Sequence, residues 1–533
     1  MLTRESLTTH NSPGESALRY HEATKHSELS MRISAHYLDW DNRPSPFKIY
    51  RNLTSTPLPH DFPQPQGDSL GAIRGEKTGN TGKDLNLQAL TELLYFSGGL
   101  TRKMRIGSET HYMRAASATG GLYPIEFYVI TRDIPGLSSG VYHFNPLDFA
   151  LVKLREGDYT PELANATAGA TTSFPLNIAL TSLAWRNAWK YEARSYRHWF
   201  WDGGVIAANL LAICSAENID SKLLMGFLDS EVDQILGLDK EQEATVAIAA
   251  IGQGAKNPAG SPPAKTRADI ATEPRSSSQV DYPIIWETNK ASEFHDRAEV
   301  DTWRHSIASG TARAGSGPKF RLPTPIENSP SLTEVILRRG STRRFAQGPI
   351  SLEALSTIID ASTTSIPVDF LSSNNSLIEF YFIANDVQGL PQGAYYFDRG
   401  TSTLEQLKAA RLRYVSGYLC LEQLLFSDAS VVFFFMTNLR EDLGKLGDRG
   451  YRAAQFEAGI RAGKIYLSAY AQGIGASGST FFDDAVTEFF SPHAEGLSTM
   501  IAVGVGVPAY KARPGRILPQ FTSSHVGPVE ERK

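Results

Sequence analysis

The chain has 533 residues, of which 41% are hydrophobic and 20% charged, as in an ordinary globular protein. This length exceeds what one hydrophobic core serves, so we expect several domains. The formal net charge of −5 and the lack of a basic block exclude a typical nucleic-acid-binding protein.

The two cysteines, Cys214 and Cys420, are too few for a disulfide framework, and neither has a second cysteine nearby for a zinc site. This usage is typical of a reducing compartment, so we expect a cytoplasmic protein. The N-terminal segment lacks the apolar stretch of a signal peptide. The longest apolar run, ASVVFFFM, suits a buried strand and is too short to span a bilayer, so we expect no membrane association.

The chain contains one sequence pattern twice. YPIEFYVIT begins at residue 123 and SLIEFYFIA at 376, while RSYRHWFWDGG begins at 194 and RGYRAAQFEAG at 449. Two further pairs follow the same order, GLSSGVYHFN with GLPQGAYYFD and GFLDSEVDQIL with TFFDDAVTEFF. A repeat this long indicates a duplicated domain and not a solenoid.

The repeat divides the chain into four parts. Residues 1–85 form an irregular lead-in, and the first copy occupies 86–256. Residues 257–330 are rich in Pro, Ser, Ala and Gly and are interpreted as a linker or wrapping arm. The second copy, with a C-terminal tail, occupies 331–533.

Each copy mixes strands with long helices. IEFYVI, LNIALTSL and TVAIAAIG are short β-rich runs, whereas WFWDGGVIAANLLAICSAEN has apolar residues at helical spacing and predicts a central buried helix. The pattern indicates an α+β fold. Two copies of one domain tend to pair about a pseudo-twofold axis, as a homodimer does, and sites at that interface take parts from both copies.

The segment GIGASG, Gly473 to Gly478, has the spacing of a dinucleotide-binding fingerprint. Helical periodicity precedes it where the fingerprint needs a strand, so we interpret the glycines as a helix C-cap and turn. Such a turn also lets a flat ligand approach the backbone closely. The sequence has no paired metal-binding histidines, no G-x-S-x-G elbow and no P-loop.

Two further motifs occur in one copy each. RRGSTRRF, from Arg338, sets four arginines around Ser341 and Thr342 and is either a phosphate clamp or a solvated basic loop. MRAASATGGLYPIE, from Met113, is a turn of small residues ahead of a strand and can expose backbone amides to a ligand. This asymmetry favours one composite site over a purely structural repeat.

Together these blocks resemble the nitroreductase superfamily, and within it the SagB-type branch of azoline dehydrogenases and cyanobactin-oxidase-like proteins, in tandem form. The matching stretches are RAASATGGLYPIEFYVI, WKYEARSYRHWFWDGG, GFLDSEVDQILGLDKEQEA and RGSTRRF. The resemblance implies a duplicated FMN-dependent nitroreductase-like fold, with the two copies forming an intramolecular pseudo-dimer and FMN held at their interface.

The resemblance also implies which residues bind the flavin. The family's arginine–serine motif contacts the phosphate and ribityl chain, and its P-S-A-G turn comes from the partner subunit, with the serine displaced by one position in this chain. The Gly-rich turn would lie beside the isoalloxazine ring, and a basic residue after the last strand, Lys511, Arg513 or Arg516, would complete the phosphate site. The implied set is Arg339, Ser341, Arg343, Ser117, Ala118, Thr119, Gly120, Gly473, Gly475 and Arg513.

Azoline dehydrogenases of this branch carry an essential Lys-Tyr pair, which WKYEARSYR places on Lys190 and Tyr191 as the catalytic residues. In the second copy Lys445 is followed by Leu446, so only the first copy keeps the pair. Two-electron oxidation needs a base for the substrate proton while the hydride leaves for the flavin. The Lys190 ammonium would lower the pKa of Tyr191 and make it that base, whereas desolvation raises the pKa, so the pair works only where the positive charge dominates.

The sequence therefore predicts an FMN-dependent oxidase or dehydrogenase acting on a peptide, amino-acid-derived or carrier-bound intermediate of natural-product biosynthesis, with azoline-to-azole oxidation as the prototype. Other pathway enzymes or a carrier protein are candidate partners, and the active form is a monomeric pseudo-dimer or a homodimer. Two alternatives stay open: an NAD(P)H-dependent nitro or quinone reductase, and a non-catalytic repeat that binds a peptide or a partner enzyme.

Overall fold

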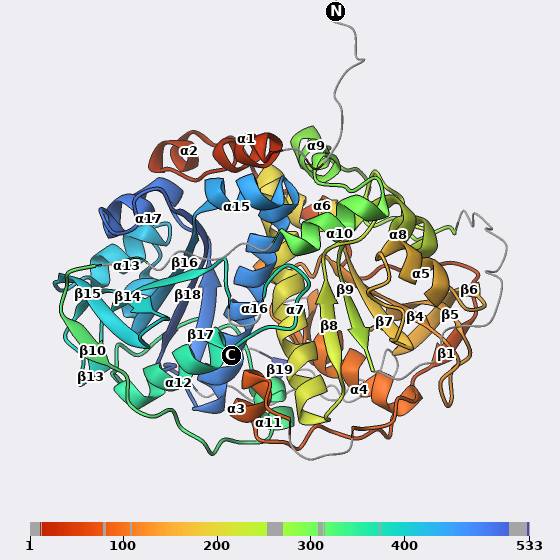
Figure 1. Cartoon of the computed structure of the whole chain (residues 1–533), viewed down its shortest axis with the longest axis horizontal. Helices are drawn as coiled ribbons and strands as arrows, with labels where there is room; N and C mark the ends of the chain where they lie inside the picture. Colours follow the sequence, from red (N-terminus) through yellow and green to blue (C-terminus); the bar gives the residue numbers. More distant parts are fainter. Residues whose placement is uncertain are drawn as a thin grey trace, which may run out of the picture.

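The chain folds into two halves, each built on a seven-stranded antiparallel sheet (Figure 1). This computed structural model describes residues 11, 13–77, 82–106, 109–252, 270–306, 313, 315–372, 375–510 and 530–531. The first sheet has the order β1–β6–β5–β4–β7–β9–β8. Its strands are β1 (Ser55–Pro57), β4 (Ile125–Thr131), β5 (Gly140–Asn145), β6 (Ala150–Glu156), β7 (Leu176–Leu183), β8 (Ser221–Leu224) and β9 (Glu243–Ile251).

The second sheet repeats the first, strand for strand, in the order β10–β15–β14–β12–β16–β18–β17. Its strands are β10 (Lys319–Arg321), β12 (Glu379–Ala384), β14 (Gly393–Asp398), β15 (Thr403–Ala409), β16 (Val431–Thr437), β17 (Gly475–Ser479) and β18 (Ser498–Gly506). Smaller pairings join β2 (Leu100–Ile106) to β3 (Glu109–Arg114) and β19 (Glu530–Glu531), and β11 (Ile350–Ser351) to β13 (Val387–Gln388). The predicted duplicated α+β fold is confirmed.

Helices cover both sheets and fill the space between the halves (Figure 1). The first half and the segments flanking it contain α1 (Glu15–Ala23), α2 (Glu28–Ile33), η1 (Trp40–Asn42), α3 (Ser69–Arg74), α4 (Leu87–Gly98), η2 (Thr119–Gly121), α5 (Thr160–Ala166), α6 (Ala184–Tyr191), η3 (Glu192–Arg194), α7 (Ser195–Ala216) and α8 (Asp229–Leu236). The remaining helices are α9 (Pro283–Ala291), α10 (Arg297–His305), α11 (Leu332–Arg338), α12 (Leu352–Thr363), α13 (Arg413–Leu419), α14 (Leu424–Asp428), α15 (Leu439–Leu446), α16 (Arg449–Ala471) and α17 (Asp483–Phe490).

The two halves meet along α7 and α16, which lie side by side at the centre of the molecule (Figure 1). Glycines let their backbones touch: a Cβ atom on Gly204 would lie 2.5 Å from the Phe456 carbonyl oxygen, and one on Gly459 would lie 2.7 Å from the Phe200 carbonyl oxygen. The helical segment Ala184–Ala216 is long and apolar enough to cross a membrane, judged by length and composition alone. However, 94% of its most apolar 18-residue window is buried inside the fold. Its apolarity therefore serves packing between the halves.

We predict that Gly204→Ala destabilises the chain by about 1–3 kcal/mol, because backbone atoms cannot move aside as a flexible side chain does. The measurement is the urea midpoint of unfolding. Gly444→Ala on α15 is the matched control, since nothing lies within 4 Å of the added Cβ and the glycine is helical. That control is expected to be neutral or slightly stabilising. Equal midpoints for the two variants would contradict the close crossing.

Buried ion pairs tie each central helix to the opposite half. Arg194, at the end of η3, and Arg197 of α7 donate to Asp483 of α17 at 2.9 and 2.8 Å. In the other direction Arg449 and Arg452 of α16 pair with Asp229 of α8. The repeated R-x-x-R block supplies the arginines of this contact, and the repeated F-x-D block supplies the aspartate. Each copy donates its arginines to the aspartate of the other copy, so the contact occurs twice about the pseudo-twofold axis. Arg194 and Arg197 thus anchor the structure.

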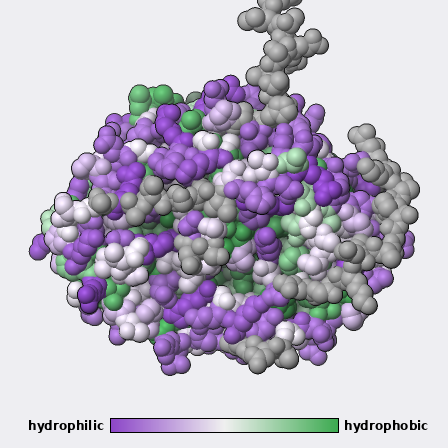
Figure 2. All heavy atoms as spheres, viewed as in Figure 1, coloured by the Kyte–Doolittle hydropathy of each residue, from purple (hydrophilic) through white to green (hydrophobic). Residues whose placement is uncertain are grey.

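Segments outside the two copies also contribute to the fold. The lead-in supplies the edge strand β1, and the segment interpreted as a linker supplies β10 and the helices α9 and α10. Figure 2 shows a mainly hydrophilic face, with a small apolar group over α2. Among the described residues, large exposed apolar side chains gather on the lead-in at Leu29, Met31, Ile33, Tyr37 and Trp40. The apolar residues of the two copies are otherwise mostly inside.

Candidate functional site

A turn of small residues follows β3 and forms one wall of the candidate site. Gly120 and Gly121 have φ angles of +64° and +67°, which favour glycine. Thr119 fixes the turn to α7, because its backbone amide donates to Asp202 Oδ1 at 2.9 Å and its hydroxyl donates to the same oxygen at 2.7 Å. Ser117 and Ala118, which precede Thr119, line a pocket beneath the turn.

The Lys-Tyr pair lies directly over this turn. Lys190 and Tyr191 end α6, and the chain then reverses into α7 through Glu192, whose φ is +49°. A Cβ atom on Gly120 would lie 2.6 Å from the Tyr191 hydroxyl, so glycine at this position makes room for the phenol. The Tyr191 ring packs edge-on against the His198 ring, with 4.6 Å between the two ring centroids. The fold therefore brings two separately predicted motifs of the first copy together.

The arginine–serine segment of the second copy reaches the same turn from the opposite side. Arg339 Nε donates to the Ala115 carbonyl oxygen at 2.8 Å, and its Nη2 donates to the Arg114 carbonyl oxygen at 3.2 Å. Two of its donor groups are thus used to hold the halves together. The Ser341 hydroxyl lies 3.5 Å from the Tyr466 hydroxyl, and the Arg343 side chain is exposed.

The Gly-rich turn lies in the second copy, between helix α16 and strand β17. Helix α16 ends at Ala471, Gly473 has a φ of +73°, and β17 begins at Gly475, so the predicted helix cap is confirmed and a dinucleotide fingerprint is excluded for this segment. A Cβ atom on Gly475 would lie 2.2 Å from Thr342 Oγ1. The glycine turn therefore packs against the arginine–serine segment.

The charges of the two copies interact across the site. Burial, with Arg343 and Arg43 nearby, lowers the pKa of Lys190. Burial also raises the pKa of Tyr191 well above its usual value, Asp202 raises it further, and Arg343 only partly opposes them. The expectation that Lys190 makes Tyr191 an easily ionised base is therefore wrong: burial outweighs the nearby positive charge and keeps the phenol neutral.

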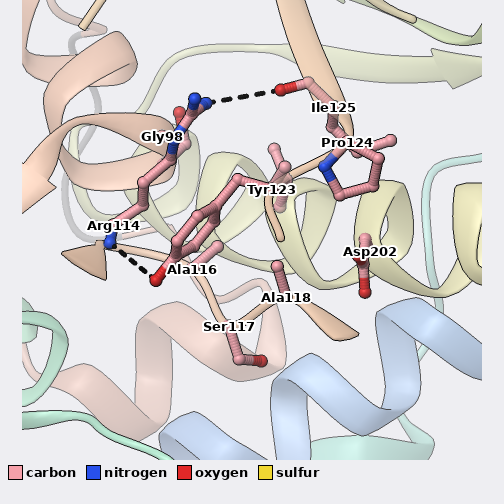
Figure 3. Close-up of a pocket in the computed structure, with 11 residues that line it drawn as sticks. Gly98, Arg114, Ala116, Ser117, Ala118, Tyr123, Pro124, Ile125 and Asp202 are labelled. Atoms are coloured by element: carbon pink, nitrogen blue, oxygen red, sulfur yellow. Dashed lines mark hydrogen bonds between the residues drawn. The ribbon is translucent and has the colours of Figure 1, made fainter. Parts of the chain in front are cut away.

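Asp202 is a site residue that the sequence argument missed. It lies on α7 and lines the pocket together with Ser97, Gly98, Arg114, Ala116, Ser117, Ala118, Tyr123, Pro124, Ile125 and Ile206 (Figure 3). Burial raises its pKa to about 7, although the bonds from Thr119 act to lower it. In the sequence, the one feature that pointed to Asp202 as a site residue is its place as a single acidic residue before the two glycines of WFWDGG.

We predict that Asp202→Asn changes how stability depends on pH. A carboxyl whose folded pKa is raised binds more protons in the native state than in the unfolded state between about pH 4 and its folded pKa of about 7, so its contribution to stability falls as pH rises through that window. The stability of the variant relative to the wild-type protein should therefore rise as the pH rises from about 4 to about 7, as measured by urea unfolding.

Asp233 provides a matched control outside the site. Its carboxylate accepts from the Thr245 hydroxyl at 2.7 Å, and burial likewise raises its pKa to about 7. Asp233→Asn should show the same pH trend in stability without altering the turn at Thr119. A stability difference for Asp202→Asn that does not change with pH would contradict the raised pKa.

Most of the predicted site residues thus come together between the two copies. In the first copy Tyr191 lies against Gly120, and in the second copy Gly475 lies against Thr342. Between the copies, Arg339 bonds to the backbone beside the small-residue turn, and Arg343 lies near enough to Lys190 to affect its pKa. The predicted tail residue Arg513 lies outside the described residues, as do Lys511 and Arg516.

Comparison with known proteins identifies the class to which this arrangement belongs. The Nitroreductase family matches the chain twice, over residues 87–253 and 336–505. These matches cover more than half of the chain, so the protein belongs to the nitroreductase family and its class is that of the oxidoreductases. The resemblance seen in the sequence, including the tandem form, is confirmed.

Individual relatives cover different shares of the chain. A protein of Methanocaldococcus jannaschii named as a nitroreductase is 25% identical over 178 residues, which are 32% of this chain and 90% of that protein. The trifolitoxin-processing protein TfxB of Rhizobium leguminosarum bv. trifolii is 28% identical over 188 residues, 34% of this chain and 50% of TfxB. The crystal structure of a nitroreductase from Anabaena variabilis matches with a TM-score of 0.75 and 27% identity, covering 93% of this chain and 100% of that one.

Proposed function

We propose that this chain is an FMN-dependent oxidase or dehydrogenase that removes a hydride and a proton from a peptide, amino-acid-derived or carrier-bound intermediate, in a reaction of the azoline-to-azole type. The observation that carries the proposal is the position of Lys190 and Tyr191 of the first copy over a turn that also meets the arginine–serine segment of the second copy. A nitro reductase has no need of that pair. The kinship with TfxB, a trifolitoxin-processing protein, supports a peptide substrate.

The described residues fit a flavin. The positive φ of Gly473 and the open space around it leave its backbone accessible to a flat ring, and nothing lies within 4 Å of a Cβ on Gly121 in the small-residue turn. Ser341 and the exposed Arg343 are suited to a phosphate and a ribityl chain, because hydroxyl and guanidinium groups bind such oxygens well. Arg513 is the proposed further contact to the phosphate.

Two residues of the chain would handle the substrate proton. FMN, when bound, supplies a two-electron acceptor. Lys190 is half-buried, with a lowered pKa, and is therefore suited to accept the proton that the substrate releases. Tyr191, whose phenol stays neutral, is suited to donate a hydrogen bond that orients the substrate. This arrangement reverses the roles that the sequence suggested for the pair.

The proposal is tested by anaerobic mixing of the flavin-loaded protein with a peptide that carries a thiazoline or oxazoline. Loss of the oxidised-flavin absorbance, together with a product lighter by two hydrogens, supports it. Lys190→Met should prevent both while flavin content stays the same. Flavin reduction by NAD(P)H alone, with no reaction of any azoline, would contradict the proposal and favour the reductase alternative. Because one chain supplies both copies, a monomer would be sufficient, with other pathway enzymes or a carrier protein as proposed partners.

A further inference from the structure

A small apolar cluster, separate from the main core, lies beside the Lys-Tyr pair. Four buried residues of the small-residue turn and α6 form it, and three partly buried residues pack against them: Leu122, Trp185, Ala188 and Trp189, with Leu38, Tyr191 and Tyr282 around them. Leu38 belongs to the lead-in, and Tyr282 to the segment interpreted as a linker. Both segments outside the two copies therefore reach the helix that ends in Lys190 and Tyr191.

The lead-in is fixed against α6 by backbone and ring contacts. Trp189 Nε1 donates to the Asp39 carbonyl oxygen at 2.9 Å, and the Trp40 ring meets the Trp189 ring edge-on, with 5.3 Å between the two ring centroids. Arg43 lies near enough to Lys190 to affect its pKa. Because Trp189 immediately precedes Lys190, this part of the lead-in borders the candidate site.

The segment around Ser276 is fixed at the same place. Trp185 Nε1 of α6 donates to the Ser276 hydroxyl at 2.7 Å. The buried Asn42 of the lead-in donates from Nδ2 to the Ser278 carbonyl oxygen at 3.1 Å, and its Oδ1 accepts from the Ser278 backbone amide at 3.1 Å. The lead-in and this segment therefore form one hydrogen-bonded border beside α6.

Two large aromatic side chains of this border face the solvent. Tyr37 is 79% exposed and Trp40 is 61% exposed, whereas Leu38 between them packs against the cluster. We call Tyr37 and Trp40 the aromatic lip. A backbone that is held by hydrogen bonds while its aromatic rings stay exposed is typical of a binding surface, because exposed apolar area contributes nothing to the stability of the fold.

The chemistry of the lip suits a side chain of the substrate. Indole and phenol rings offer flat apolar surface, which an aliphatic or aromatic side chain covers well. The flavin is proposed to lie elsewhere, at Ser341, Arg343 and Gly473. Because Trp40 contacts the residue next to Lys190, a group bound at the lip belongs to the same molecule as the reacting bond. A peptide supplies such a neighbouring side chain, whereas a small nitro compound or quinone does not.

We propose that Tyr37 and Trp40 form a substrate subsite, which binds an apolar or aromatic side chain of a peptide next to the residue that is oxidised. This inference rests on the proposed function for the reaction, and it narrows the substrate class to peptides with such a neighbour. The lip contributes binding and takes no part in the chemistry, so its loss should raise KM and leave kcat unchanged.

The test uses two short capped peptides that each contain one thiazoline, flanked on both sides by phenylalanine or on both sides by glycine. The flavin-loaded wild-type protein should have a KM about tenfold lower for the phenylalanine peptide, as expected for an anchoring aromatic contact. Trp40→Ala should raise the KM of that peptide to the value of the glycine peptide, whose own KM should not change. Trp40→Phe should keep most of the preference.

Two further variants control for folding and for exposed apolar surface in general. Tyr37→Ala removes the more exposed ring and should raise the KM of the phenylalanine peptide in the same direction as Trp40→Ala. Leu424→Ala removes another large exposed apolar side chain, which is 78% exposed on α14 of the second half, and should leave both KM values unchanged. Melting temperatures show that each variant has folded.

Binding is also measured without turnover, by calorimetry with the corresponding thiazole peptides, which have already lost the two hydrogens. Tighter binding of the phenylalanine-flanked thiazole that Trp40→Ala abolishes, in a protein that oxidises neither thiazoline, would support the subsite while the proposed function fails. Oxidation of both thiazolines with equal KM values and equal thiazole affinities would overturn the subsite while the proposed function stands.

Three other results would also overturn the inference. They are a preference that Trp40→Ala leaves intact, the absence of binding of either thiazole peptide, and a change of oligomeric state in Trp40→Ala, seen by sedimentation, with unchanged peptide binding. The last result would assign the aromatic lip to a contact between two copies of the chain.

Discussion

Tyr191→Phe is expected to reduce oxidation of an azoline-type substrate by about 10²–10³-fold, as the loss of one active-site hydrogen-bond donor does, while leaving the FMN content of the protein unchanged. The phenylalanine ring keeps the edge-on contact with His198, whereas the hydroxyl over Gly120 is lost. The loss should appear in kcat rather than KM, because the hydroxyl is proposed to act on the reacting group. Steady-state kinetics with a flavin-saturated protein measure it.

Tyr196→Phe is the control for this variant. Tyr196 is also a buried tyrosine of the segment WKYEARSYRHWFWDGG, but its hydroxyl lies 3.3 Å from Asn289 Oδ1. Removing the Tyr196 hydroxyl should leave kcat within about twofold of the wild-type value, because the partner of this hydroxyl, Asn289, is not a residue of the candidate site. If Tyr191→Phe kept full turnover and nitro reduction were the best activity of both proteins, the oxidase proposal would fail.

Asp483→Ala is expected to have the largest effect on stability, a loss of about 3–5 kcal/mol. Although burial acts to raise it, Arg194 and Arg197 hold the pKa of Asp483 well below its usual range, so the carboxylate is charged at neutral pH. Removing it leaves two buried guanidinium groups without their anion. Unfolding in urea at neutral pH measures the loss.

The adjacent residue provides a control for the same helix. Asp484 is 71% exposed and pairs with Lys25 at the surface. Asp484→Ala should therefore cost no more than about 1 kcal/mol, as exposed ion pairs generally do. Similar losses for the two variants would mean that the arginine–aspartate contacts do not hold the halves together.

The sequence was sufficient to predict the fold because the repeated blocks coincide with buried elements. ASVVFFFM became β16, LNIALTSL became β7, and WFWDGGVIAANLLAICSAEN lies within and just beyond α7. In each of these runs the apolar pattern is set by burial on every side, and that pattern distinguishes a core helix or strand from a surface one.

Other features depend on contacts between distant residues and left little trace in local pattern. The helices α9 and α10 lie in a segment whose composition suggested a linker, and they are held in place by packing: Ile285, Val300 and Trp303 are buried against the rest of the chain. The site role of Asp202 depends on Thr119, which is far away in sequence. The neutral state of Tyr191 depends on burial of its hydroxyl, and the spacing of residues in a sequence does not show whether a single hydroxyl is buried.

The central claim is that the two copies build a single flavin site in one chain. The measurement that tests it most directly is the amount of FMN bound per chain, from the visible spectrum of the purified protein and the mass of the released chromophore. We predict one FMN per chain. Two per chain would show that the second interface position is also open, and a protein that stays colourless with added FMN would leave Lys190, Tyr191 and the arginine–serine segment without the chemistry proposed for them.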